Sequence, residues 1–175
     1  MARRVTLTAR RVCAVFLPLA LTSAFGAATP MAAQVAFAPP AEAKFQRYGT
    51  NEELILQGRI LDAVTRACEA HLPVGVSIHV LVEDVAPTYP TREQLSANQT
   101  LDPVKTHYLG GAALSGNLLG DHGEVLTTVR HRYYPSTIEW RSRQYDPWSD
   151  ANRAIAQFAD QLGAACRNIA PRSSS

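Results

Sequence analysis

The chain has 175 residues, with 17 Lys and Arg against 15 Asp and Glu and a hydrophobic fraction of 46%. This length and composition suit one domain with one hydrophobic core. Four of the basic residues lie in the first eleven positions, and without them 13 bases face 15 acids, a net charge of −2. That balance excludes the broad positive field of a nucleic-acid-binding protein, so we expect no nucleic acid partner.

Residues 1–33 have the pattern of a Sec-type secretory signal peptide. Four arginines and no acid precede the apolar run VCAVFLPLALTSAFGAA, which is followed by small residues. The apolar run is short for a membrane span and contains a proline, so we expect cleavage and no stable span afterwards. Ala28, Ala33 and Ala38 are candidate exit positions, of which we choose Ala33. The expected location is the periplasm or the exterior of a Gram-negative bacterium.

Two cysteines, Cys68 and Cys166, remain after removal of the signal. An even pair in an exported chain usually forms a disulfide. Closing a loop of about 100 residues would stabilise the fold by about 4–5 kcal/mol on the chain-entropy argument. Two buried thiols are the alternative. The third cysteine lies at the start of the apolar run, which is the wrong end for a lipid anchor.

The mature chain is predicted to hold a single α+β domain at 51–170, after a flexible tether at 34–50 and before a disordered tail at 171–175. The tether is predicted from two adjacent prolines and little periodicity. A helix is predicted over 52–70, where Asn51 is a good N-cap. Its apolar stripe comprises Leu54, Ile60, Leu61, Val64, Ala67 and Cys68.

Alternation predicts the next element, a strand with one buried face. Valine and isoleucine occupy every second position from Val74 to Val82, as a half-buried strand requires. A long polar loop with three prolines follows. One helical turn is expected within it, near TREQLSA.

The segment 110–134 is predicted to form a β-hairpin. With 120–123 in the turn, Leu118 would face Val125 and Leu114 would face Val129. This register gathers apolar residues on one side and polar residues on the other, so a slip by one position would mix the two sets. Arg130 and Arg132 would then share the face directed away from the helices.

A further strand is expected within STIEWRSRQY, and a terminal helix follows it. Asp146 or Ser149 can cap this helix, and Pro147 suits its first position. The apolar stripe of the helix comprises Ala151, Ile155, Phe158, Leu162, Ala165 and Ile169. The economical fold is α+β, with two helices packed on one face of a mainly antiparallel sheet of three to five strands. Parallel neighbouring helices would bring the two cysteines together.

The sequence gives no support for a catalytic, cofactor-binding or metal-binding site. It contains no G-x-S-x-G, H-E-x-x-H or C-x-x-C motif, and its five histidines are scattered. Glu83 and Asp84 form a carboxylate pair, but the pair closes a strand before a proline-containing loop. We therefore expect a protein that is not an enzyme and has no cofactor.

The chemistry that remains is a basic, aromatic run. The candidate binding surface is Arg130, Arg132, Arg141, Arg143 and Tyr134. Arginine binds phosphate and carboxylate well, and aromatic rings supply flat contact area. The alternative is that these charges only keep an exposed sheet face and edge soluble.

The stretch GGAALSGNLLGDHGEVLTTV, followed by a tryptophan and by DANRAIAQFADQL, resembles small uncharacterised exported proteins and lipoproteins of Gram-negative bacteria. Such proteins look like the amino-terminal domain of TolB, an α/β module of envelope complexes. The resemblance covers residues 109–165 and implies a role in binding or assembly. This chain lacks the anchoring cysteine of the lipoprotein members, and no family active-site residue carries over.

These observations predict an exported, non-enzymatic envelope accessory or binding protein. Its expected partner is an envelope protein or an anionic envelope component. Two alternatives remain open, namely a small secreted hydrolase-type enzyme and an inhibitory or structural module.

Overall fold

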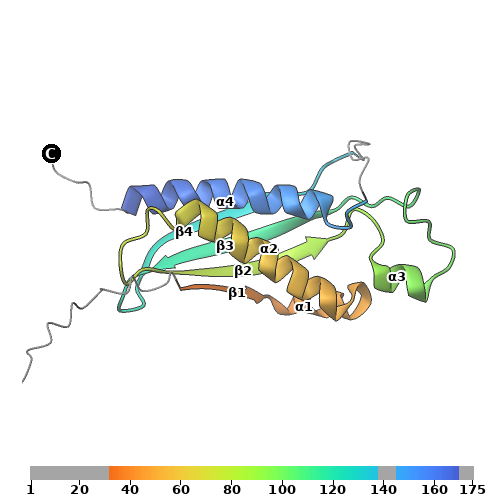
Figure 1. Cartoon of the computed structure of the whole chain (residues 1–175), viewed down its shortest axis with the longest axis horizontal. Coiled ribbons are helices and arrows are strands. Elements are labelled where there is room, and N and C mark those ends of the chain that lie inside the picture. Colours follow the sequence, from red (N-terminus) through yellow and green to blue (C-terminus); the bar gives the residue numbers. More distant parts are fainter. Residues whose placement is uncertain (1–31, 138–144, 170–175) are drawn as a thin grey trace, which may run out of the picture.

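The computed structural model describes residues 32–137 and 145–169. Four strands and four helices lie in these ranges (Figure 1). In chain order they are β1 (Ala33–Phe37), α1 (Pro39–Tyr48), α2 (Thr50–Cys68), β2 (Ser77–Ala86), α3 (Arg92–Ala97), β3 (Gly111–Leu119), β4 (Val125–Tyr133) and α4 (Ser149–Ile169). The predicted signal segment 1–33, except for its last two residues, lies outside the described residues. The expected strand after Pro135 and the terminal tail also fall wholly or largely outside them.

The four strands form one sheet in the order β1-β2-β3-β4. The pairs β2–β3 and β3–β4 are antiparallel, whereas β1 runs parallel to β2. The parallel pair arises because α1 and α2 connect these two strands and return the chain to the starting edge of the sheet. The predicted α+β class is therefore confirmed, but the sheet is mixed.

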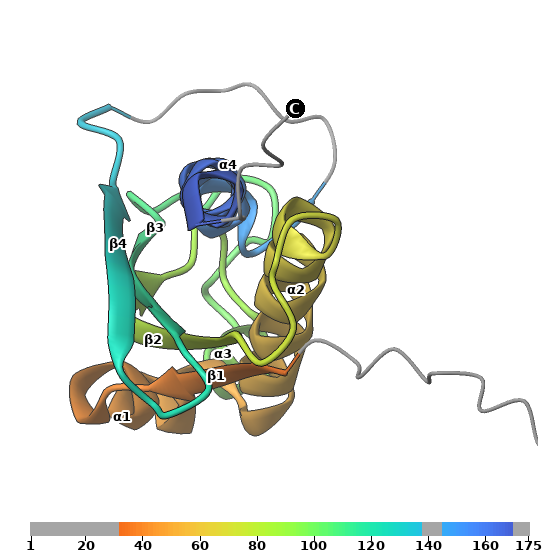
Figure 2. The same ribbon diagram turned by 90° about the vertical axis from the view of Figure 1, so that its left-hand side faces the viewer.

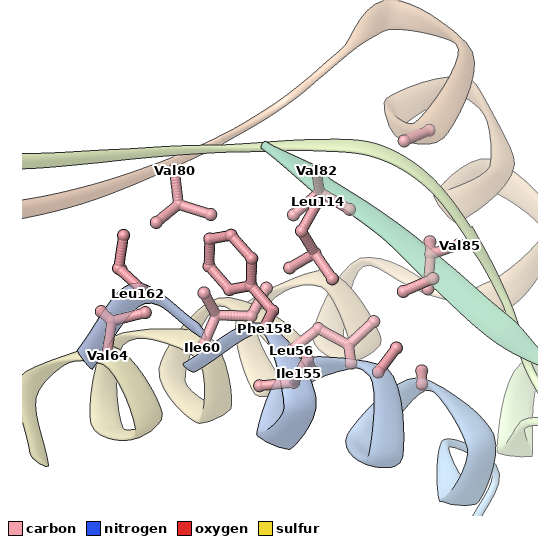
Figure 3. Close-up of a cluster of buried hydrophobic side chains, with 14 of the residues drawn as sticks. Leu56, Ile60, Val64, Val80, Val82, Val85, Leu114, Ile155, Phe158 and Leu162 are labelled. Atoms are coloured by element: carbon pink, nitrogen blue, oxygen red, sulfur yellow. The ribbon is translucent and has the colours of Figure 1, made fainter. Parts of the chain in front are cut away.

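Helices α2 and α4 pack together on one face of the sheet (Figures 1 and 2). Alternate side chains of β2 and β3 point toward them, and the contact between the two layers forms the core. Figure 3 labels ten of these buried side chains, namely Leu56, Ile60, Val64, Val80, Val82, Val85, Leu114, Ile155, Phe158 and Leu162. The ring of Phe158 packs against Gly116 of β3. A Cβ atom built on Gly116 would lie 2.7 Å from the Cζ atom of Phe158, so a larger residue at this position would displace the ring.

A disulfide between Cys68 and Cys166 joins the C-terminal ends of α2 and α4, as the sequence predicts. Their Cα atoms are 5.6 Å apart, and both side chains are fully buried. The two helices also approach closely in this region. A Cβ atom on Gly163 would lie 2.9 Å from the carbonyl oxygen of Ala67, so only glycine fits there without displacement.

The prediction of a flexible tether at 34–50 is wrong, because this segment forms β1 and α1. Prolines at the first two helical positions are compatible with a helix start, where the backbone N–H groups have no partner within the helix. Ala41, Phe45 and Tyr48 are buried at helical spacing. Phe45 stacks edge-on against Phe37 with ring centroids 5.1 Å apart, so α1 closes the end of the core beyond β1.

The hairpin is present, but its register differs from the predicted one by two residues. Leu118 pairs with Thr127 and Leu114 with His131. The turn is one residue longer than expected, and a register shift near the tip adds a second residue to β4. A shift of two positions leaves the side chains from Thr127 to Tyr133 on their predicted faces, because side chains alternate along a strand. Val125 at the tip pairs with Leu119 and is exposed, so its predicted place on the apolar face is wrong.

The expected helical turn in the long loop is α3. Thr91 and Gln94 form a reciprocal capping box at its start. No helix among the described residues is long and apolar enough to cross a membrane.

Candidate functional site

Strand β4 places two of the predicted surface residues side by side on the outward face of the sheet. Arg130 and Arg132 are exposed, whereas Val129, His131 and Tyr133 between and beside them are half-buried toward α4. Because successive side chains alternate, the two guanidinium groups project in the same direction. Arg141 and Arg143, the other two predicted arginines, lie outside the described residues.

The outward neighbours of these arginines on β3 are small. Arg130 pairs with Ser115, and Arg132 pairs with Ala113. Neither arginine forms an ion pair with a carboxylate in the described ranges. The small neighbours leave both guanidinium groups exposed on the outward face, with no carboxylate of the described residues to neutralise them.

Tyr134, the fifth predicted residue, has a positioning role in this arrangement. It is half-buried just beyond β4, and its hydroxyl donates a hydrogen bond of 2.9 Å to Oδ2 of Asp84. The Cζ atom of Arg132 lies 5.0 Å from the centroid of the Tyr134 ring, which is cation–π distance. Burial, followed by the hydrogen bond to Asp84, raises the pKa of Tyr134. The ring therefore supports Arg132, while its hydroxyl is held by the sheet.

Asp84 links the sheet to α1. Lys44 on α1 forms a hydrogen-bonded ion pair with Asp84 and donates a second hydrogen bond of 3.2 Å to the carbonyl of Val85. Partial burial alone would raise the pKa of Asp84. The hydrogen bonds from Lys44 and Tyr134 and the charge of Lys44 outweigh burial, so this pKa is lowered from its ordinary value. The contacts at this corner therefore form a continuous series from Lys44 through Asp84 and Tyr134 to Arg132.

The opposite side of β4 is flanked by α4. His131 lies between two amide side chains, with Nε2 3.0 Å from Oε1 of Gln157 and Nδ1 3.0 Å from Nε2 of Gln161. Arg153 donates a hydrogen bond of 3.0 Å to the hydroxyl of Tyr133 and lies over its ring. These contacts hold one side of α4 along β4, and the sequence did not reveal them.

A separate open groove of about 720 Å³ lies where α2, α3 and the start of α4 meet. Its lining includes Glu52, Arg59, Arg92, Tyr145, Asp146 and Trp148. The indole Nε1 of Trp148 donates to Glu52 over 2.6 Å. Arg59 contacts Asp146 at 3.2 Å. The carboxylates of this groove are thus already engaged by donors from distant parts of the chain.

These groove contacts serve to fix the start of α4. Asn152 accepts from Arg59 over 3.0 Å and donates to Asp146 over 2.7 Å, which completes a triangle of side chains. The hydroxyl of Tyr145 donates to the carbonyl of Pro90, and burial raises the pKa of this hydroxyl. Sequence reasoning assigned Asp146 only as a possible helix cap, since no local pattern indicates a partner 87 positions earlier.

In the two described ranges, no group of three or more His, Cys, Asp and Glu side chains is arranged to hold a metal ion. Comparisons with protein families, with curated proteins and with solved structures found no match to this chain. The resemblance to the TolB amino-terminal domain therefore stays a hypothesis.

Proposed function

We propose that the chain is an exported, non-enzymatic accessory protein of the bacterial envelope, and that it binds an anionic component through the outward face of β4. One observation carries the proposal. Arg130 and Arg132 stand on consecutive outward positions of a rigid strand, exposed and without a carboxylate partner in the described part of the chain. Guanidinium groups in this arrangement suit carboxylate and phosphate ligands.

The surroundings of Arg132 favour binding over mere solubility. A solubilising arginine needs no support, whereas Arg132 rests on the ring of Tyr134, which is itself tied to Asp84. A side chain that is already ordered loses less conformational entropy when a ligand arrives. The chain without its first 33 residues also has a net charge of −2, so the arginine face is a local feature and not part of a general positive field.

The export part of the proposal rests on the signal-like N-terminus and on the disulfide. Disulfides persist in oxidising compartments such as the periplasm and are rare in the cytosol. The non-enzymatic part rests on how the acids are used. Three carboxylates take part in contacts that hold helices to the sheet or to each other. The pairs are Asp84 with Lys44, Glu52 with Trp148, and Asp146 with Arg59.

The test compares two charge-matched double variants. Arg130→Gln/Arg132→Gln removes the proposed surface, and Arg66→Gln/Arg167→Gln removes two exposed arginines from the C-terminal ends of α2 and α4. Each protein is mixed with washed envelope fractions and sedimented, after thermal unfolding has shown that both variants fold. We expect the first variant to lose retention and the second to keep it. Equal retention of the two variants would refute the proposal.

A further inference from the structure

Strand β4 is an open edge of the sheet. It is the last strand in the order β1-β2-β3-β4, and its only strand partner within the described residues is β3. Figure 2 shows it at the margin of the sheet, with no helix beyond its free side. It runs for nine residues without a proline, whereas the opposite edge strand β1 has five residues and packs against α2. A long edge of this kind exposes backbone donors and acceptors that can pair with another strand.

We propose that this edge binds an extended acidic segment of a partner protein, which adds to the sheet as a fifth strand beside β4. The inference rests on the proposed function for the role of its arginines, and it adds the partner class and the binding mode. Main-chain hydrogen bonds to the edge would supply affinity, and alternate side chains would supply specificity, as in other cases of strand addition.

The two sides of the edge define the sequence that fits. Every second side chain of an added strand would lie on the outward face beside Arg130 and Arg132, where Asp and Glu are complementary. The intervening side chains would point toward α4 and meet Gln157, Gln161 and Arg153. These polar groups already contact His131 and Tyr133, so α4 and β4 form a preset boundary for that side of the segment.

Charge decides between an acidic partner and a second copy of this chain. Two copies joined through antiparallel β4 strands would share one continuous outward face. Such a pairing would gather four guanidinium groups on a short stretch of sheet, where like charges repel. An acidic strand instead brings carboxylates to the same positions. A membrane surface would satisfy the arginines but would leave the backbone groups of the edge without strand partners.

The probe is a fluorescein-labelled nine-residue peptide of alternating Glu and Thr. Two further peptides carry N-methyl groups either on every Glu or on every Thr, so that composition and charge are matched while one edge of the strand loses its N–H donors. We expect the unmodified peptide to bind and one of the methylated peptides to bind at least about tenfold more weakly, with the other little changed. Fluorescence anisotropy at low and high salt measures the affinities.

The outcomes separate this inference from the proposed function. Equal binding of all three peptides would refute strand addition, while the proposal that the arginines bind an anionic component would still stand. No binding of any peptide at about 1 mM, or tighter binding to phosphatidylglycerol vesicles than to the peptide, would overturn the choice of partner. Unchanged peptide affinity of Arg130→Gln/Arg132→Gln would also refute the inference, and unchanged envelope retention of that variant would refute the proposed function itself. Increased hydrogen-exchange protection of the β4 amides on addition of the unmodified peptide would support strand addition.

Discussion

Loss of the disulfide should remove a large part of the stability of the domain. Cys68 and Cys166 are 98 positions apart, and on the chain-entropy argument a cross-link over that distance stabilises the folded state by about 4.7 kcal/mol. The net stability of a domain is only about 5–15 kcal/mol. The double variant Cys68→Ala/Cys166→Ala should therefore lose between a third and nearly all of its free energy of unfolding.

Equilibrium unfolding in urea measures this loss. Trp148 is a suitable fluorescence probe because it is almost completely buried, and a Trp140→Phe background leaves it as the only indole. Dithiothreitol provides the internal control, since it should destabilise the parent protein and leave the double variant unchanged. Because both cysteines are fully buried, reduction of the parent should be slow in buffer and fast once urea opens the fold.

A loss below about 1 kcal/mol would contradict the reasoning. It would mean that the unfolded chain already keeps the α2 and α4 segments near each other, so that the cross-link restricts it little. The close approach of Gly163 to Ala67 is the contact that could produce such a result. Replacing Gly163 with leucine in the double variant would then separate the helices and expose their contribution.

Four further predictions concern other contacts of the fold. Tyr134→Phe should lower the free energy of unfolding by about 1 kcal/mol, a value that allows for the partial exposure of Asp84, and chemical denaturation measures it. The same substitution should weaken peptide binding, measured by anisotropy, because Arg132 loses its support. Because the pKa of Asp84 is lowered in the folded protein, its carboxylate adds to stability above the ordinary pKa of 3.8, and this stability is lost as the pH falls through the folded pKa. Asp84→Asn should therefore flatten the acid limb of a plot of stability against pH. An unchanged acid limb would contradict this assignment. Gly116→Val should cost roughly 1–3 kcal/mol through collision with Phe158, as thermal unfolding would show, whereas the outward Thr128→Val should cost little. A chain that begins at Pro39 lacks β1 and should melt well below one that begins at Thr29, and equal melting temperatures would show that β1 adds nothing.

The elements that the sequence revealed are those with strong local periodicity. The alternation predicted from Val74 to Val82 marks the buried face of β2 at Ile78, Val80 and Val82, although Val74 lies before the strand and is exposed. The stripe of Ile155, Phe158 and Leu162 is the buried face of α4. The pairing of the cysteines followed from their number and from export. In each case a short window of sequence, or a simple count, contains the physical information.

The features that the sequence did not reveal depend on distant partners. β1 is only five residues long and gains its strand character from pairing with β2, while α1 begins with two prolines that suggested a linker. The spacing of Ala41, Phe45 and Tyr48 was a usable signal for the missed helix. The contacts of Asp84 with Lys44 and with Tyr134 join residues 40 and 50 positions apart, so no local pattern could have indicated that Tyr134 would support Arg132.

The 98-residue separation of the paired cysteines also sets an order of events during biogenesis. In a chain that crosses a membrane with its N-terminus first, Cys68 emerges early. It can form the disulfide only after Cys166 emerges, near the end of the polypeptide. A product that ends before residue 166 would keep an unpaired thiol at Cys68 and would lack part of the helix that α2 packs against. Oxidation would thus mark only completed chains, and truncated ones would stay open to quality-control proteases.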